Sequence, residues 1–184
     1  MSAPELSVEA RKALLRLARQ ALVDHYAGQA TTIPEGPPVL RVRAGAFVTL
    51  RGRDGGLRGC VGTMEPGDAL GEAVARLAVV AATSDDRFPA VTASEVEGLV
   101  LEISALGPLR DVEPEGVLVG CHGLMVRAAG RQGVLLPQVA TEQGWDRETF
   151  LEKTCQKAGL PRDAWRGAGT RIRAFEATVF GEND

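Results

Sequence analysis

The stretch Leu57-Arg58-Gly59-Cys60-Val61-Gly62-Thr63 places a thiol between two glycines and close behind an arginine. It is also one half of the first hairpin that the sequence predicts. Ala46 to Arg51 alternates in the manner of a strand, Arg53-Asp54-Gly55-Gly56 has the composition of a turn, and a return strand is expected from Leu57 to Met64. Glycine permits a positive φ or the close approach of another group. The pattern therefore predicts a strand that presents its cysteine in an unusual setting.

Outside this hairpin, apolar residues at helical spacing predict further helices, and alternating or apolar runs predict further strands. Ser7 and Asp146 are expected to cap helices, and Thr92 with Glu95 fits a capping box at a short turn. Helices interleaved with hairpins favour an α+β fold over a regular parallel sheet. The expected helices cover residues 7–28, 68–82, 137–144 and 146–159, and the expected strands cover 99–106, 116–119, 123–128, 134–136 and 171–180, with a turn at 131–133.

Composition narrows the class of protein. The 184 residues are 45% hydrophobic, which suffices for one domain with a sizeable core or for two small subdomains. The net charge of −3, without a basic run, argues against nucleic acid as a partner. Three widely spaced cysteines do not describe a disulfide framework. Residues 1–5 lack the features of a signal peptide, and no apolar stretch is long enough to span a membrane. We therefore expect a cytoplasmic protein with reduced thiols.

A series of short motifs, in their joint order and spacing, resembles the AMMECR1 domain family, whose microbial members are called AmmeMemoRadiSam system protein A. The resemblance covers nearly the whole chain, and the isoleucine usual in the family is replaced here by Val61, which is also β-branched. The motifs are Phe47-Val48-Thr49-Leu50, Leu57-Arg58-Gly59-Cys60-Val61-Gly62, Asp86-Arg87-Phe88-Pro89, Glu102-Ile103-Ser104, Gly120-Cys121-His122-Gly123-Leu124, Leu135-Leu136-Pro137-Gln138-Val139-Ala140 and Gly144-Trp145-Asp146.

The resemblance implies a single AMMECR1 domain over residues 1–184, of α+β class, with two subdomains that each hold an antiparallel β-sheet flanked by α-helices. The larger subdomain is expected to contain both termini, and the smaller one is expected to come from the middle of the chain. The family name also implies association with a Memo-like protein and a radical SAM protein. The resemblance names no reaction and no cofactor.

The residues around Cys60 suggest a site, although a small buried thiol in a strand is an equally good interpretation. Strand alternation puts Arg58 and Cys60 on one face, and a face that carries an arginine is seldom a dry core. The guanidinium can favour a thiolate or bind an anionic ligand. On the functional interpretation Arg58, Gly59 and Gly62 bind a substrate or an anion beside Cys60, which is a candidate catalytic residue.

Four further residues are candidates for the same site. His122 is either a loop histidine bonded to the backbone or a proton carrier for Cys60. Asp86 and Arg87 belong, together with Asp85, either to a solvated loop or to an ion-paired latch, in which Asp86 holds an arginine such as Arg58. Cys155 is expected on the apolar side of its helix, packed into the hydrophobic core. Convergence of Cys60, His122 and Cys155 would give a zinc-type ligand set, but the compact ligand pairs of zinc sites are missing, so no metal is expected.

Two functions of different class follow. The first is an enzyme component that uses Cys60 as a nucleophile, with His122 as proton carrier, on a small anionic or carbonyl substrate. The second is a non-catalytic adaptor whose cleft binds the Memo-like or the radical SAM partner. A third, purely structural interpretation assigns the glycines and the cysteine to folding alone.

Overall fold

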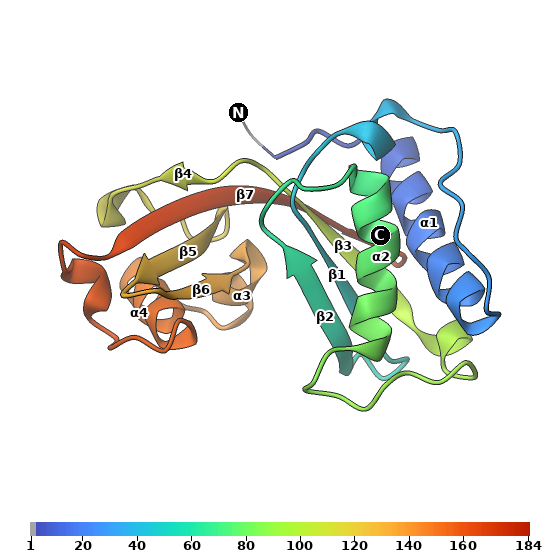
Figure 1. The fold of residues 1–184 in the computed structure, drawn as a ribbon. Helices are drawn as coiled ribbons and strands as arrows, with labels where there is room; N and C mark the ends of the chain where they lie inside the picture. Colours follow the sequence, from blue (N-terminus) through green and yellow to red (C-terminus); the bar gives the residue numbers. More distant parts are fainter. Residues whose placement is uncertain (1–2) are drawn as a thin grey trace. The chain divides into compact units, whose positions relative to one another are not determined.

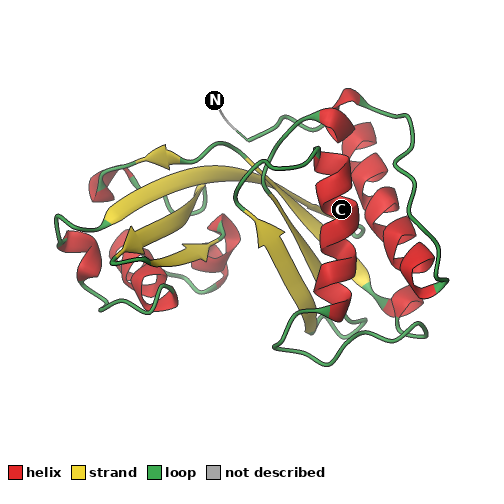
Figure 2. Cartoon of the chain, in the orientation of Figure 1, coloured by secondary structure: helices red, strands yellow, loops and turns green. Residues whose placement is uncertain are grey.

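The computed structural model describes residues 3–184. Met1 and Ser2, at the start of the segment compared above with signal peptides, lie outside the described residues. The chain divides into two compact units, of which the larger comprises residues 4–106 and 178–184. The other comprises residues 107–177 together with Ala3. The boundary between the units falls within the last strand. Both combine helices with antiparallel strands, so the α+β class is confirmed (Figure 2).

The larger unit is built on the predicted hairpin. Strand β1 (Ala46–Arg51) pairs with β2 (Leu57–Thr63) on one side and with β3 (Val100–Leu106) on the other, both antiparallel. The end of β7 (Arg171–Gly181) lies beside β3, where the Glu182 N–H donates to the Leu101 carbonyl. Strand β2 is therefore the edge of this sheet (Figure 1).

Two helices cover one face of this sheet (Figure 1). They are α1 (Val8–Tyr26), whose N-cap Ser7 accepts the Ala10 N–H as predicted, and α2 (Leu70–Thr83). Val48 and Leu50 of β1 are fully buried beneath the helices, whereas their neighbours Phe47 and Arg51 are half-buried on the opposite face. Burial of one face of a strand is the expected consequence of its alternating pattern. Two 3₁₀ helices, Pro38–Arg41 and Val96–Gly98, complete the unit.

The smaller unit holds antiparallel strands that pair around β7. Strand β5 (His122–Ala128) pairs with β6 (Arg131–Leu135) and with β7, and the short β4 (Arg110–Asp111) pairs with the other edge of β7. Helices α3 (Pro137–Glu142) and α4 (Arg147–Lys157) contribute Ala140, Phe150 and Leu151 to its core. The Asp146 carboxylate caps α4 by accepting the Thr149 N–H, as its sequence predicted. Two further 3₁₀ helices, Pro114–Gly116 and Ala164–Arg166, lie in its connections.

Two predictions in this unit are wrong. Residues 116–119 do not form a strand, because Pro114 starts a 3₁₀ helix and the Leu118 carbonyl then closes a turn by accepting the N–H groups of Cys121 and His122. The turn expected at 131–133 lies instead at Ala129 and Gly130, which take positive φ values of 49° and 74°. Positive φ at both central residues is typical of a two-residue hairpin loop. Residues 131–133 are consequently part of β6.

No helix within residues 3–184 is both long and apolar enough to cross a membrane. The two longest helices, α1 and α2, instead lie on the sheet of the larger unit, with the buried sides that their apolar spacing predicted.

Candidate functional site

Cys60 lies on the edge strand β2, where its backbone faces away from β1. Its Cα partner on β1 is Thr49, but its N–H and carbonyl bond to side chains of the loop after α2. The two residues therefore form a pair without mutual backbone hydrogen bonds, the arrangement in which facing side chains come closest. Accordingly, the Thr49 hydroxyl donates to the Cys60 sulfur over 3.2 Å.

An ion pair between Asp85 and Arg87 occupies both free backbone groups of Cys60. The Asp85 Oδ2 accepts the Cys60 N–H at 2.8 Å, and the Arg87 Nη2 donates to the Cys60 carbonyl at 3.1 Å. Arg87 also holds the carboxylate with both arms of its guanidinium, Nε to Oδ1 at 2.9 Å and Nη2 to Oδ2 at 2.7 Å. Bidentate arginine–carboxylate pairs are strong and geometrically defined. The pair thus takes the place that a neighbouring strand would have at this edge.

The electrostatics of this ion pair involve the thiol. The Arg87 guanidinium, with the Cys60 N–H, holds the pKa of Asp85 well below its ordinary value. Asp85 in turn raises the pKa of Arg87. The Thr49 hydroxyl donates to the Cys60 sulfur, and the Arg87 guanidinium is bonded to the carbonyl of the same residue. Hydrogen-bond donors and cations near a cysteine favour the thiolate, which is its reactive form.

Arg58 has a different partner from the one that alternation suggested. The register of β1 and β2 shifts between Leu50 and Arg51, which pair with Gly59 and Leu57, so Arg58 is the extra residue of a β-bulge. A bulge re-aims a side chain relative to simple alternation. The Arg58 guanidinium bonds to the Glu95 carboxylate at 2.9 Å and to the Pro89 carbonyl at 3.1 Å. It is therefore already engaged by the segment that follows the Asp85 loop.

The predicted capping box at Thr92 supports this second ion pair. The Glu95 carboxylate accepts both the N–H and the hydroxyl of Thr92, at 2.7 and 2.9 Å. These bonds, followed by the bond from Arg58, lower the pKa of Glu95 to about 2. The carboxylate thus stays ionised at neutral pH and keeps Arg58 in place. It is this glutamate, rather than Asp86, that pairs with Arg58.

The two glycines near Cys60 do not take a positive φ. They are needed because neighbouring atoms lie where a side chain would be. A Cβ on Gly59 would lie 2.1 Å from the Ala81 carbonyl oxygen of α2. The absent side chain therefore lets the end of α2 touch β2, which brings the loop with Asp85 to Cys60. A Cβ on Gly62 would lie 2.2 Å from the Phe47 ring, which covers that glycine from the neighbouring strand.

The other predicted site residues lie elsewhere. Asp86 is exposed, and the carboxylate at Cys60 is that of its neighbour Asp85. His122 belongs to the smaller unit, where its Nδ1 accepts the Leu118 N–H at 3.2 Å, so its ring is bonded to the backbone. It lines a cavity of about 180 Å³ within that unit, together with Glu176.

The remaining cysteines are unlike Cys60. Cys155 is fully buried in the core of the smaller unit, as predicted, and burial raises the pKa of its thiol. Cys121 is exposed. The described residues, 3–184, contain no group of three histidine, cysteine or acidic side chains close enough to hold a metal ion.

Three contacts around Cys60 were not predicted from the sequence: Thr49 with the Cys60 sulfur, Asp85 with the Cys60 backbone, and Glu95 with Arg58. Glu95 was identified only as part of a capping box. Thr49 stands opposite Cys60 in the predicted hairpin, so the strand register would have found it. Asp85 carries no such signal, because its role depends on how α2 ends against Gly59. The contacts within the hairpin join residues that are close in sequence, whereas the contacts of the Asp85 loop join residues that are far apart in sequence.

The chain is thus a two-unit α+β protein, with Cys60 on an edge strand of its larger unit. The family model AMMECR1 matches residues 15–180, and the chain belongs to the AMMECR1 family. A relative in Methanothermobacter thermautotrophicus is 42% identical over 97% of each chain, and Protein MK0488 of Methanopyrus kandleri is 43% identical over 98% of this chain and 92% of its own. The crystal structure of the uncharacterized protein PH0010 from Pyrococcus horikoshii superimposes with a TM-score of 0.91 at 39% identity, covering 96% of this chain and 93% of its own.

Proposed function

We propose that this AMMECR1-domain protein is a thiol-dependent enzyme component that acts through Cys60 in a system with a Memo-like and a radical SAM protein. The observation that carries the proposal is the Asp85–Arg87 pair, which fixes the Cys60 backbone on both sides and places a guanidinium at the same residue as the thiol. At the buried Cys155, in contrast, burial raises the pKa of the thiol and outweighs a hydrogen bond from the backbone of Trp165. The proposed setting is the cytoplasm, where thiols stay reduced.

In this proposal Arg87 takes the role of binding a small anionic or carbonyl substrate. Its side chain is 52% exposed while it holds Asp85, whereas Arg58 is 22% exposed and engaged by Glu95 and Pro89. A guanidinium that is both fixed and accessible suits an anionic group. Gly59 and Gly62 act by shaping the strand, and His122 remains a proposed proton carrier.

The test is the rate at which iodoacetamide alkylates Cys60 at pH 7 in the folded chain and in urea, read by peptide mass spectrometry. We expect the folded chain to react about fivefold faster at Cys60, because the donors stabilise the attacking thiolate. Cys121, which is exposed in the folded chain, serves as the internal control and should differ little between the two states. If Cys60 reacted at an equal or lower rate in the folded chain than in urea, the proposal of a reactive thiol would be contradicted.

The alternative function is an adaptor without catalysis, favoured by the open edge of β2. Gly62 shares with Cys60 the outward backbone orientation, yet within residues 3–184 no side chain caps its N–H or carbonyl. Uncapped edge groups are a template for an added strand. Arg58→Ala, which frees the neighbouring segment, should then weaken co-elution with the Memo-like or radical SAM protein while Cys60→Ser leaves it intact. Absence of binding to both partners by the wild-type chain would count against the adaptor.

A further inference from the structure

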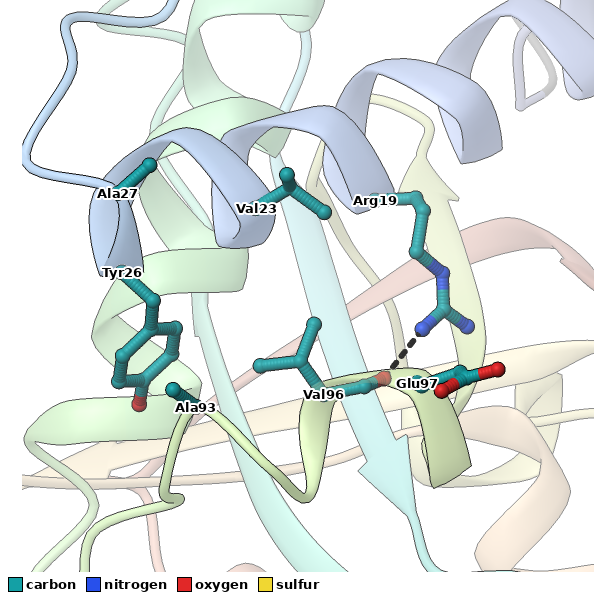
Figure 3. Close-up of a pocket in the computed structure, with 7 residues that line it drawn as sticks. All are labelled: Arg19, Val23, Tyr26, Ala27, Ala93, Val96 and Glu97. Atoms are coloured by element: carbon teal, nitrogen blue, oxygen red, sulfur yellow. Dashed lines mark hydrogen bonds between the residues drawn. The ribbon is translucent and has the colours of Figure 1, made fainter.

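The larger unit carries a groove between the C-terminal half of α1 and the turn that contains the 3₁₀ helix Val96–Gly98 (Figure 3). Its volume is about 500 Å³, within the range of small-molecule sites. Val23 and Val96 lie in its middle, the Tyr26 ring closes one end, and Glu97 lies with Arg19 at the other (Figure 3). The groove is therefore apolar along its length and charged at one end.

The apolar part is accessible and held in shape. Val23 is 47% exposed, an uncommon position for a large aliphatic side chain beside a concave surface. The Tyr26 hydroxyl donates to the Val91 carbonyl at 2.5 Å, which fixes the ring against the turn. Burial raises the pKa of Tyr26, followed by the charge of nearby Glu95, so the hydroxyl stays a neutral donor. The groove is thus preformed and needs no rearrangement to admit an apolar group.

The charged end favours a cation. The Arg19 guanidinium is engaged by Glu182 and by the carbonyls of Val96 and Leu99, so four of its N–H groups and its charge are already matched. The Glu97 carboxylate, in contrast, has no hydrogen bond or ion pair within residues 3–184. The groove consequently presents one unmatched negative charge at the end of an apolar surface.

We propose that this groove binds a small ligand with an apolar, preferably aromatic, body and a protonated amine, the body lying on Val23 and Val96 and the amine on Glu97. The body replaces water over apolar surface, which supplies most of the binding. The amine supplies orientation through a charge-assisted hydrogen bond to the carboxylate. The inference does not depend on the reactivity of Cys60.

The chain offers a selective probe, because Tyr26 is its single tyrosine. Incorporation of 3-fluorotyrosine gives one fluorine NMR signal, located in the groove, in the full-length chain. The test ligands are 2-phenylethylamine and 3-phenylpropionate, which have similar apolar bodies and opposite charges. We expect the amine to shift the signal saturably with a Kd on the order of 1–10 mM, as suits a ligand of this size.

The charge requirement is tested with Glu97→Gln, matched by the exposed control Glu35→Gln. Glu97→Gln should weaken amine binding about two- to fivefold, the range of an exposed ion pair, and leave the acid unchanged. Val23→Asn, at an exposed position where folding should survive, should abolish the shift because it removes apolar surface without adding charge, with the dispersion of the proton spectrum reporting an intact fold. Equal shifts from amine and acid, an unaltered affinity in Glu97→Gln, or no saturable shift would each overturn the proposal.

Discussion

Cys60 and Cys155 show how the same side chain takes on different chemistry in the two units. Cys155 lies at full burial on α4, among apolar neighbours that raise the pKa of its thiol. Cys60 lies at an edge strand, half-buried, with the Thr49 hydroxyl on its sulfur and the Asp85–Arg87 pair on its backbone. Apolar burial stabilises the neutral thiol, whereas donors stabilise the charged form. Cys155 is therefore a packing residue of the core, and Cys60 is the cysteine to which we propose a chemical role.

The difference comes from the elements around each thiol rather than from the thiol itself. The helix α4 buries one side, and Cys155 shares that side with Leu151, so its environment follows from helical spacing alone. An edge strand leaves backbone groups unpaired, and those groups recruit polar side chains. At Cys60 the recruited side chains are charged, and they place a guanidinium on the Cys60 carbonyl.

The largest expected effect is the difference in alkylation between these two cysteines. In the folded chain at pH 7, Cys155 should react at least about a hundredfold more slowly than Cys60, because it becomes accessible only when the unit opens. Peptide mass spectrometry after a time course of iodoacetamide treatment measures both rates in one sample. In urea the two rates should converge. Comparable alkylation rates of Cys60 and Cys155 in the folded state would contradict this difference between the two thiols.

Gly59→Ala should produce the largest loss of stability. The new Cβ would meet the Ala81 carbonyl oxygen, and backbone cannot yield as a side chain can, so we expect a loss of about 3 kcal/mol in the free energy of unfolding. Chemical denaturation measures it. The matched control is Gly67→Ala, at an exposed glycine without neighbours within 4 Å, which should change stability by less than about 0.5 kcal/mol. Equal effects from the two variants would contradict the close contact between α2 and β2.

Cys155→Ser should destabilise the chain by about 2 kcal/mol, because it puts a hydroxyl into an apolar core position. The alkylation rate of Cys60 should stay unchanged. Denaturation and alkylation of the same preparation give both answers. A slower Cys60 in a fully folded Cys155→Ser chain would show that the two thiols are not independent, contrary to the comparison.

Asp85→Asn should have a smaller, pH-dependent effect of about 1.5 kcal/mol at pH 7, the scale of a hydrogen bond to a charged group. The pKa of Asp85 is lower in the folded chain than in the unfolded one, so its contribution is complete above the unfolded value near 3.8 and is lost as the pH falls further. Denaturation of both chains from pH 7 to pH 2 should show the difference shrinking below about pH 4. A difference that grows with acidity would contradict the ion pair.

Much of the fold could be predicted from the sequence, because its signals are local. The hairpin of β1 and β2, the Ser7 and Asp146 caps and the buried side of α4 depend on residues a few positions apart. Residues 116–119 were wrongly predicted as a strand because Val117 and Leu118 suit a strand by composition, whereas Pro114 had already begun a 3₁₀ helix.

The candidate site could be predicted only in part. Cys60 and the glycines stood out by their composition, and Arg87 was named as part of a loop that could form an ion-paired latch. The carboxylate of that latch was predicted to be Asp86, holding an arginine such as Arg58, whereas the structure pairs Asp85 with Arg87; sequence alone does not say where the chain leaves α2. The role of Arg58 was obscured by the β-bulge, which breaks the alternation used to place it beside Cys60. These features depend on tertiary contacts that no spacing rule contains.

We propose that the Asp85–Arg87 pair, rather than exposure alone, makes Cys60 a reactive thiol. The alkylation rate of Cys60 at pH 7 in Arg87→Gln, compared with the wild-type chain and with Cys121 as the internal reference, tests this proposal directly. We expect Cys60 to slow about fivefold in Arg87→Gln, because a neighbouring cation is removed, while Cys121 keeps its rate. An unchanged or faster rate at Cys60, in a variant that remains folded, would contradict the claim.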